Sequence, residues 1–475
     1  MVEVNDLLEE ITVVKRNGKK VPFDGAKIAL AIKKGFDSVE VDDDESEKER
    51  KYTSKDIQKV YQAVLKKIEK DADAKNKRFK IEEIQDYIEG ELSNKGYQDV
   101  YESFSSYRER RNQSRESFFG DNKTHKFLKS IENLGLKSAN EEDAKRENAN
   151  IDGNSPMGTM LQYGATVSKE FAKAYLMKKE FAEAHDNGTI HIHDMDFLAM
   201  GTTTCCQIDL SKLFKNGFDT GHGYIRTPQD ISTYGALAAI AIQSNQNDQH
   251  GGQAIPALDY YMAPGVLKTF KKQFKQTIYD FLDLEGFIPV INIDRIIREI
   301  DKVDSIELNV EDFSDYAKGS SRIHEIFTKA YQKALQKTDR ATQQAMEAFI
   351  HNLNTMHSRA GAQVPFSSVN FGTDTSPEGR MVIKNFLLSA DRGLGRGETP
   401  IFPVSIFKVK EGVNYNKEDP NYDLFRLACK VSAKRLFPNF AFIDAPFNLQ
   451  YYKEGDYNTE IAYMGCRTRV IGDVT

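Results

Sequence analysis

Apolar residues recur every three or four positions over residues 54–70 and again over 81–94. That spacing predicts two amphipathic helices, and a third helix is expected to end at Tyr107–Arg111. Ahead of them, two short apolar runs flank an Asn-Gly pair, the strongest local signal for a β-hairpin. A helix should follow from about Ala26. The first hundred or so residues therefore predict a small, mainly helical α+β domain.

Residues 114–150 are polar and charged and predict a linker. Beyond them, long helical patterns alternate with short strand patterns. The predicted helices lie at 176–187, after Pro228, and at 267–283, 324–335, 340–357, 376–391 and 421–436. The predicted strands lie at 189–196, 289–291, 365–372, 400–406, 439–443 and 461–464. Such alternation is typical of an α/β fold, with the strands inside, where they can close into a barrel.

Composition narrows the class of protein. Lys plus Arg is 65 against 71 for Asp plus Glu, so the net charge is −6, and nothing global predicts a nucleic-acid-binding surface. Four cysteines in 475 residues do not make a disulfide framework. The first residues lack a signal-peptide pattern, and no stretch of 18 apolar residues predicts a membrane helix. We expect a cytoplasmic protein with reduced thiols.

Two thiol sites stand about 260 residues apart. Cys466 lies between a glycine, which allows close backbone approach, and Arg467, which can hold an anion. Cys205 and Cys206 follow a run of threonines. Free cysteines are most often small core residues, so cysteine chemistry needs support from the rest of the chain.

A cationic cluster lies around the predicted hairpin. Lys15, Arg16 and Lys27 could converge on a polyphosphate near a helix start, where backbone N–H groups favour anions. Solvated lysines on an exposed hairpin explain the charges equally well. The chain contains no P-loop pattern.

Two further polar motifs stand out. His191 and His193 alternate on the predicted strand at 189–196; with no third ligand in sight, a hydrogen-bonded pair is favoured over a metal site. The tract Ser244–Gln253 is polar between apolar segments, so it is either a site lining or a capping loop. No metal-binding residue is predicted.

The first domain resembles the ATP-cone, a small regulatory nucleotide-binding domain, over about 11–113. The resemblance is carried by Val14–Gly18, Val21–Asp24, Lys27–Ile28, Thr53–Ile57 and Tyr107–Arg111. It implies that ATP or dATP would contact Lys15, Arg16, Lys27, Ser54 and Arg108.

The region from Asn148 to Val470 resembles the catalytic domain of the anaerobic, class III ribonucleoside-triphosphate reductases. The stretches that carry the resemblance are Asn154–Met160, Ile190–Asp194, Thr202–Gln207, Gln249–Gln253, Pro365–Gly372, Asp444–Asn448 and Met464–Thr468. The resemblance implies a ten-stranded α/β barrel of two half-sheets with an internal finger loop. Domains are thus expected at 1–113 (cone), 114–150 (linker) and 151–475 (barrel).

The resemblance also implies the chemistry, reduction of ribonucleoside triphosphates to deoxyribonucleoside triphosphates. Cys466 matches the finger-loop position of the thiyl radical. Cys205 matches the second thiol, although Cys206 stays open for that role. A glycyl radical, made by a radical-SAM iron–sulfur activating enzyme, would generate the thiyl, and formate or a thiol would be the reductant.

Regulation and assembly follow from the same resemblance. Arg226, Gln229 and Lys272 fall where dNTP specificity effectors bind at a dimer interface, although solvated surface charges explain them too. A homodimer or a larger nucleotide-dependent oligomer is expected. Family members continue past the finger loop to a zinc site and the radical glycine, so this chain is expected to be an inactive fragment.

Two other interpretations remain. A glycyl-radical enzyme of the formate-lyase type also uses adjacent cysteines, but it needs no nucleotide sensor. A nucleotide-sensing repressor would explain the ATP-cone, but it leaves the region after the linker without a role.

Overall fold

The computed structural model describes residues 8, 10–15, 19–39, 51–119, 155–311, 313, 320–359, 362–465 and 469–470. The chain divides into two compact units. One comprises the described parts of 1–136 with 164–199, and the other those of 137–163 with 200–475. Each unit has its own buried apolar cluster.

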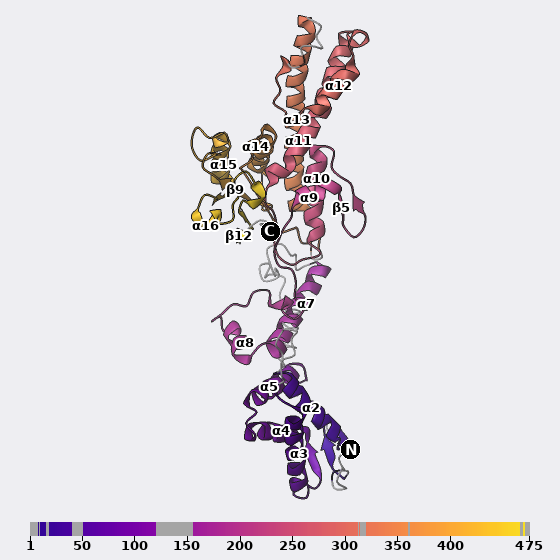
Figure 1. Ribbon diagram of the computed structural model, residues 1–475, viewed down its shortest axis with the longest axis vertical. Helices are drawn as coiled ribbons and strands as arrows, with labels where there is room; N and C mark the ends of the chain where they lie inside the picture. The colour runs from indigo at the N-terminus through magenta and orange to yellow at the C-terminus, as the bar shows by residue number, and fades with distance from the viewer. Residues whose placement is uncertain are drawn as a thin grey trace. The chain divides into compact units, whose positions relative to one another are not determined.

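The first unit contains the expected α+β domain (Figure 1). Strand β1 (Thr12–Val14) pairs antiparallel with β2 (Lys20–Pro22) and parallel with β3 (Arg78–Lys80). The helices are α2 (Gly25–Asp37), α3 (Ser54–Asp71), α4 (Ile81–Asn94) and α5 (Gln98–Phe119). The apolar faces of α2, α3 and α4 bury Ile32, Val60 and Leu92 completely, so the helical period predicted these three helices. The expected end of the third predicted helix at Tyr107–Arg111 is wrong, because α5 runs on to Phe119, into the predicted linker.

The rest of the first unit is helical and irregular. Helix α7 (Pro156–Phe171), which starts in the second unit, continues as a π-helical turn, η2 (Ala172–Leu176), followed by α8 (Lys179–Asp186) and the 3₁₀ turn η3 (Met195–Phe197). The strand predicted at 189–196 is wrong. Asp194 has φ = 51°, in the left-handed region, which an extended strand cannot contain.

The second unit is built on a five-stranded sheet in the order β10–β9–β8–β7–β4, and all its strands are parallel. These strands are β4 (Cys206–Gln207), β7 (Gln253–Ile255), β8 (Ser367–Phe371), β9 (Val404–Val409) and β10 (Asn439–Phe442). The α/β class is confirmed. Among the described residues this parallel sheet has five strands, so the ten-stranded barrel stays a prediction.

Long helices pack against one another and on the sheet. They are α10 (Ile231–Asn245), α11 (Leu258–Leu284), α13 (Ser321–Thr355), α14 (Pro377–Arg392) and α15 (Tyr422–Arg435). Shorter elements are α9 (Leu210–Asn216), the hairpin β5 (Phe218–Asp219) with β6 (Tyr224–Ile225), η4 (Ile288–Val290), α12 (Ile293–Lys302), α16 (Pro446–Leu449), η6 (Tyr457–Thr459), and β11 (Ala462–Tyr463) paired with β12 (Arg469–Val470).

Three predictions for this unit need correction. The strand at 289–291 is the 3₁₀ turn η4, and α11 starts at Leu258, ahead of the expected 267, with Pro264 inside it. The two helices at 324–335 and 340–357 are the single helix α13. Thr338 and Thr342 at its middle are buried, and each hydroxyl donates to the carbonyl four residues earlier. No helix among the described residues is long and apolar enough to cross a membrane.

Candidate active site

The two faces of strand β8 have different chemistry. Val369 and Phe371 belong to the apolar core, and the Phe371 ring lies 4.9 Å from that of Phe386 on α14. Ser368 and Asn370 alternate with them and must therefore point to the opposite face. Both are buried, so this second face of the sheet is also covered.

The segment Tyr463–Gly465 covers the second face. The amide of Asn370 acts like a piece of backbone: its Oδ1 accepts from the N–H of Tyr463 at 2.8 Å, and its Nδ2 donates to the Tyr463 carbonyl at 2.9 Å. Ser368 Oγ accepts from the N–H of Gly465 at 3.0 Å. Two polar side chains of β8 thus hold the chain directly ahead of Cys466.

The last described residue of this segment needs to be glycine. A Cβ on Gly465 would lie 3.1 Å from Cβ of Val404 on β9 and 3.5 Å from the ring of Phe366. The neighbours of Gly465 are side chains, so the glycine makes room for Val404 and Phe366, and the expected close approach of two backbones stays a prediction. Cys466 itself lies outside the described residues.

Cys206 points away from this segment. It pairs with Gln253 of β7, and its sulfur accepts a hydrogen bond from Asn245 Nδ2 of α10 at 3.1 Å. Asn245 also donates to Gln253 Oε1 at 2.8 Å. Burial raises the pKa of the Cys206 thiol, and the hydrogen bond from Asn245 opposes the rise only in part. Cys206 is a packing residue on the helix side of the sheet.

Strand alternation places Cys205 on the opposite face. Ile208, two residues after Cys206, lies in the helix-side core, so Gln207 faces the side that carries Ser368; Cys205 directly precedes β4, and only continued alternation predicts the same side for it. Cys205 is exposed. A Cβ on Gly251 would lie 1.6 Å from the Thr204 carbonyl oxygen and 3.0 Å from the Cys205 sulfur, so the chain ahead of β7 packs tightly against this cysteine.

The register places Gln207, two residues after Cys205, on the same face of the sheet as Ser368, which holds Gly465. Gln207 pairs with Ala254, and Ala254 pairs with Ser368, the residue that holds Gly465. Two strand spacings separate Gln207 from Ser368, a distance of about 10 Å. The polar tract Ser244–Gln253 ends in β7, between the two, but Asn245 in it bonds Cys206 and Gln253 on the helix side, so the choice between a site lining and a capping loop stays a prediction.

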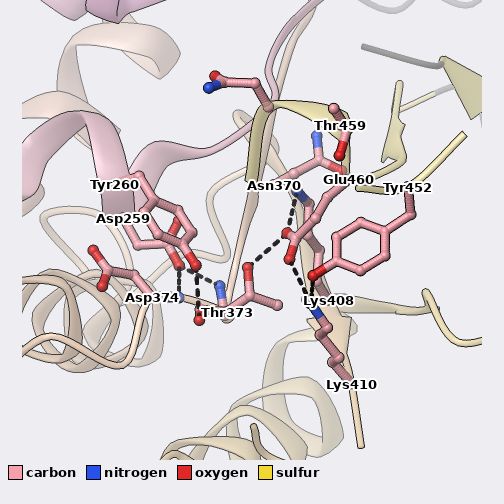
Figure 2. A network of polar contacts seen from close by, with 12 residues as sticks. Asp259, Tyr260, Asn370, Thr373, Asp374, Lys408, Lys410, Tyr452, Thr459 and Glu460 are labelled. Carbon is pink, nitrogen blue, oxygen red and sulfur yellow. Dashed lines mark hydrogen bonds and ion pairs between the residues drawn. The ribbon is translucent and has the colours of Figure 1, made fainter. Parts of the chain in front are cut away.

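A buried polar network lies farther along the same segment (Figure 2). Glu460 accepts from Lys408 Nζ at 3.2 Å, from Lys410 Nζ at 3.3 Å and from Thr373 Oγ1 at 2.8 Å. The Lys408 and Glu460 side chains are 2% and 3% exposed. Burial would raise the pKa of Glu460, but the charges of the two lysines outweigh it and hold that pKa below its usual value.

Two buried carboxyl groups lie beside this network. Asp259 Oδ2 accepts from the N–H groups of Gly372 and Asp374 at 2.8 and 3.1 Å, and burial raises the pKa of Asp259. Burial, and then the charge of Asp259, raise the pKa of Asp374 to about 7. No sequence argument singled out these residues. Asp259 lies on α11 and Asp374 follows β8, so no alternation within a strand could have marked them.

A second candidate site is a cavity of about 630 Å³ beside α11. Four lysines spaced for one helix face point toward it, of which only Lys272 was predicted. Its lining consists of Gln229, Lys268, Lys271, Lys272, Lys275, Gln276, Tyr279, Ile297 and Asp301. The predicted Gln229 and Lys272 are thus brought together, whereas Arg226 is exposed and not among the lining residues.

The predicted ATP site is only partly assembled. Lys15 follows β1 and is exposed; Lys27, in the first turn of α2, pairs with Asp24 at 2.9 Å. Ser54 is the first residue of α3, which packs on α2. Arg108 instead pairs with Asp86 and Glu89 of α4 at 2.6 and 2.7 Å. Arg16 lies outside the described residues.

The histidine pair has the predicted contact without the predicted strand. His191 Nε2 and His193 Nδ1 are 3.4 Å apart. Within the described ranges, no group of three or more His, Cys, Asp or Glu side chains could hold a metal ion.

Comparison with known proteins identifies both parts of the chain. The profile of the family described as anaerobic ribonucleoside-triphosphate reductase matches residues 147–474, and that of the ATP cone domain matches 11–113. The anaerobic ribonucleoside-triphosphate reductase of Haemophilus influenzae is 28% identical over 458 residues, which are 96% of this chain and 54% of that protein. The enzyme of the same name from Enterobacteria phage T4 is 31% identical over 341 residues, 70% of this chain and 47% of that one.

The chain also has a weak similarity to a solved structure. The anaerobic ribonucleotide reductase of Thermotoga maritima, with dATP bound in its specificity site, is 14% identical with a TM-score of 0.35, over 84% of this chain and 52% of that chain. The chain spans about half the length of the curated relatives that it matches. Because the family profile covers well over half of its residues, the chain belongs to the anaerobic ribonucleoside-triphosphate reductase family.

Proposed function

We propose that the protein reduces ribonucleoside triphosphates to 2′-deoxyribonucleoside triphosphates in the cytoplasm, with Cys466 and Cys205 as the two thiols. The observation that carries the proposal is the shared face: Ser368 and Asn370 hold the chain ahead of Cys466 over the side of the sheet to which Cys205 points. Family membership makes a formate-lyase or a repressor the poorer interpretation.

The reaction balances on these two sulfurs and an external reductant. The Cys466 thiyl takes the hydrogen atom from C3′ of the ribose and becomes a thiol. The 2′-hydroxyl leaves with a proton as water, and the Cys205 thiol gives a hydrogen atom to C2′, which leaves a Cys205 thiyl and a carbonyl group at C3′. The reductant then returns a hydrogen atom to Cys205 and gives one electron, with a proton, to the C3′ carbonyl. Cys466 then returns hydrogen to C3′, which restores its thiyl. Formate or a dithiol supplies the two electrons that the product has gained.

The glycyl radical of the family supplies the oxidising equivalent that makes the thiyl. The described residues hold no group of three or more His, Cys, Asp or Glu side chains for the family's zinc, and no step is assigned to the zinc or to the glycyl radical. A radical-SAM activating enzyme is the proposed partner. The five-stranded parallel sheet is proposed as one half of the ten-stranded barrel.

Two regulatory sites complete the proposal. The cavity beside α11 would hold a dNTP effector, because four lysines there can neutralise a triphosphate; Arg226 would reach the same effector from the loop ahead of α10. The effector site is expected to lie at a homodimer interface. In the cone, Lys15, Arg16, Lys27 and Ser54 would contact ATP or dATP.

Arg108 would contact ATP or dATP only after leaving its carboxylate partners on α4, Asp86 and Glu89. The proposed domains remain 1–113, 114–150 and 151–475.

The test is turnover by the full-length protein after anaerobic activation. Wild type should convert a ribonucleoside triphosphate to its deoxy form, whereas Cys466→Ser should not, although it should still show the glycyl radical by electron paramagnetic resonance. A hydroxyl holds its hydrogen too strongly to pass the radical on. Cys429→Ser, on α15, is the matched control and should stay active. Turnover by Cys466→Ser would overturn the assignment.

A further inference from the structure

We propose that the buried Lys408–Glu460 ion pair positions the cysteine segment, by which we mean Glu460–Gly465, the stretch directly ahead of Cys466. Both side chains would then be positioning residues for the reaction. The inference rests on the proposed function. Glu460 stands six residues ahead of Cys466 in the sequence. Its carboxylate is held at three points: by Lys408 and Lys410 of β9 and its continuation, and by Thr373 just after β8 (Figure 2). The base of the segment is thus tied to the two central strands.

Local backbone pairing cannot fix the segment by itself. Strand β11 is two residues long, and its partner β12 is equally short. A one-residue slip of an extended segment turns every side chain to the other face. A short ladder of this kind resists such a slip weakly, so other contacts must set the register.

The ion pair is suited to that task. Two charges as buried as those of Lys408 and Glu460 are expensive to remove from water, and an apolar pair of the same size could be equally stable. What charges add is selectivity, because a slipped register would leave Lys408 buried without its carboxylate. The apolar Ile461, itself buried, would then approach the ammonium group. The ion pair therefore disfavours any register of the segment other than the observed one.

The contacts form one line along the segment. Glu460 is fixed by Lys408, Tyr463 by Asn370 and Gly465 by Ser368. Lys408, Asn370 and Ser368 share one face of the sheet, since β8 and β9 pair Asn370 with Ile406 and Ser368 with Val404. Of these three contacts, only the one between Lys408 and Glu460 depends on charge.

Hydrogen-atom transfer makes the register matter for rate. The sulfur has to lie in contact with C3′, and a misplacement of about 1 Å can cost roughly a hundredfold in rate. Loss of the ion pair should therefore lower kcat and leave KM for the nucleotide almost unchanged, because Lys408 and Glu460 are buried and bonded within the protein and are assigned no contact with the nucleotide.

The test variant is the doubly neutral Lys408→Met/Glu460→Gln, which leaves no buried charge unpaired within the pair. In the full-length enzyme we expect kcat to fall roughly tenfold or more, with KM changed less than about twofold, normal thermal unfolding and a normal glycyl radical signal. The charge-swapped Lys408→Glu/Glu460→Lys should recover part of the lost kcat. The matched control is Lys384→Met/Asp339→Asn, an ion pair at 2.9 Å between α14 and α13 on the helix side, which should leave kcat unchanged.

A second measurement does not depend on activity. In this 475-residue chain with Cys205, Cys206 and Cys429 replaced by Ala, the rate of alkylation of Cys466 should rise severalfold in the doubly neutral variant and not in the control. An unchanged alkylation rate, or a wild-type kcat in a folded doubly neutral enzyme, would overturn the positioning role. If wild type shows no turnover at all while the alkylation rate rises as expected, the proposed function fails and the anchor stands.

Discussion

The two faces of the parallel sheet differ in chemistry: one packs in the apolar core, and the other forms hydrogen bonds and an ion pair with one segment of chain. On the helix side, Val369, Phe371 and Phe407 are buried in one large apolar cluster. On the other side, Ser368, Asn370 and Lys408 are as deeply buried, yet each is bonded to one segment of chain, Glu460–Gly465. Apolar contacts are non-directional and supply stability, whereas the polar ones specify where that segment lies.

This contrast also assigns the adjacent cysteines. Cys206 falls on the stabilising face, where Asn245 holds it, and Cys205 falls on the face that holds the cysteine segment. One step along the chain thus separates the packing thiol Cys206 from Cys205, the thiol that we propose for the chemistry.

The largest expected effect is on stability. Phe371→Ala removes a fully buried ring from the helix side and should cost about 3–5 kcal/mol. Asn370→Ala leaves the N–H and C=O of Tyr463 without partners and should cost roughly 1–3 kcal/mol. Urea unfolding of the sheet-containing unit measures both.

Alkylation of Cys466 separates the two faces further. Asn370→Ala should speed it in the folded state, whereas Phe371→Ala should not. Equal acceleration by both changes would erase the distinction between the faces.

The next effect is a pH dependence at the end of β8. The folded-state pKa of Asp374, about 7 because of burial and then the charge of Asp259, lies above its unfolded value of 3.8. The unfolded chain loses the proton first, so this group's stabilising contribution is full below pH 4 and is lost as the pH rises to 7. Linkage converts a shift of this size to roughly 4 kcal/mol.

Asp374→Asn, which mimics the protonated acid, should therefore stabilise the protein at pH 8 and change little at pH 4. Urea unfolding at the two pH values checks it. A stability difference that does not vary with pH would contradict the assignment.

The lysines beside α11 extend the comparison to buried and solvent-exposed charges. Lys408 is neutralised by Glu460, whereas Lys272 beside α11 is 71% exposed, 3.7 Å from Asp230, and can take a phosphate. Lys271→Ala/Lys272→Ala should weaken dNTP binding by about 1–2 kcal/mol and flatten the effect of effectors on substrate choice. Lys333→Ala, an exposed charge on α13, is the control. Unchanged dNTP affinity by calorimetry would remove the effector site from this cavity.

The smallest effect is expected in the cone. Lys15→Ala/Lys27→Ala should weaken ATP binding by roughly 1 kcal/mol, because Lys27 already shares its charge with Asp24. Lys33→Ala, an exposed lysine of the same helix that pairs with Asp37, should leave the affinity unchanged. If the two variants bind ATP with the same affinity in a calorimetric titration, the predicted phosphate contacts are wrong.

The spacing of apolar residues along the chain predicted those elements in which the buried face is marked at regular intervals. Helix α4 was expected at its observed bounds, Ile81–Asn94. Helix α13 was divided in two because Thr338 and Thr342 interrupt the apolar pattern, although their hydroxyls bond to the preceding turn and tolerate burial. The strand expected around His191 and His193 failed because alternation over a few residues does not exclude an irregular loop.

The site was less predictable from the sequence. Cysteine positions were recognisable, but the choice between Cys205 and Cys206 needs strand register, since β4 is only two residues long. Lys408 and Glu460 are 52 residues apart, and neither has a local signal. Partners that meet only through the sheet stay invisible until the fold is known.

The central claim is that the face of the sheet decides which thiol reacts. The most direct measurement is deoxyribonucleotide formation by full-length Cys205→Ser and Cys206→Ser, with the glycyl radical signal and thermal unfolding recorded for each. The account predicts no turnover by Cys205→Ser and near-normal turnover by Cys206→Ser, with radical and stability intact in both. An active Cys205→Ser, or an inactive but stable Cys206→Ser, would contradict it.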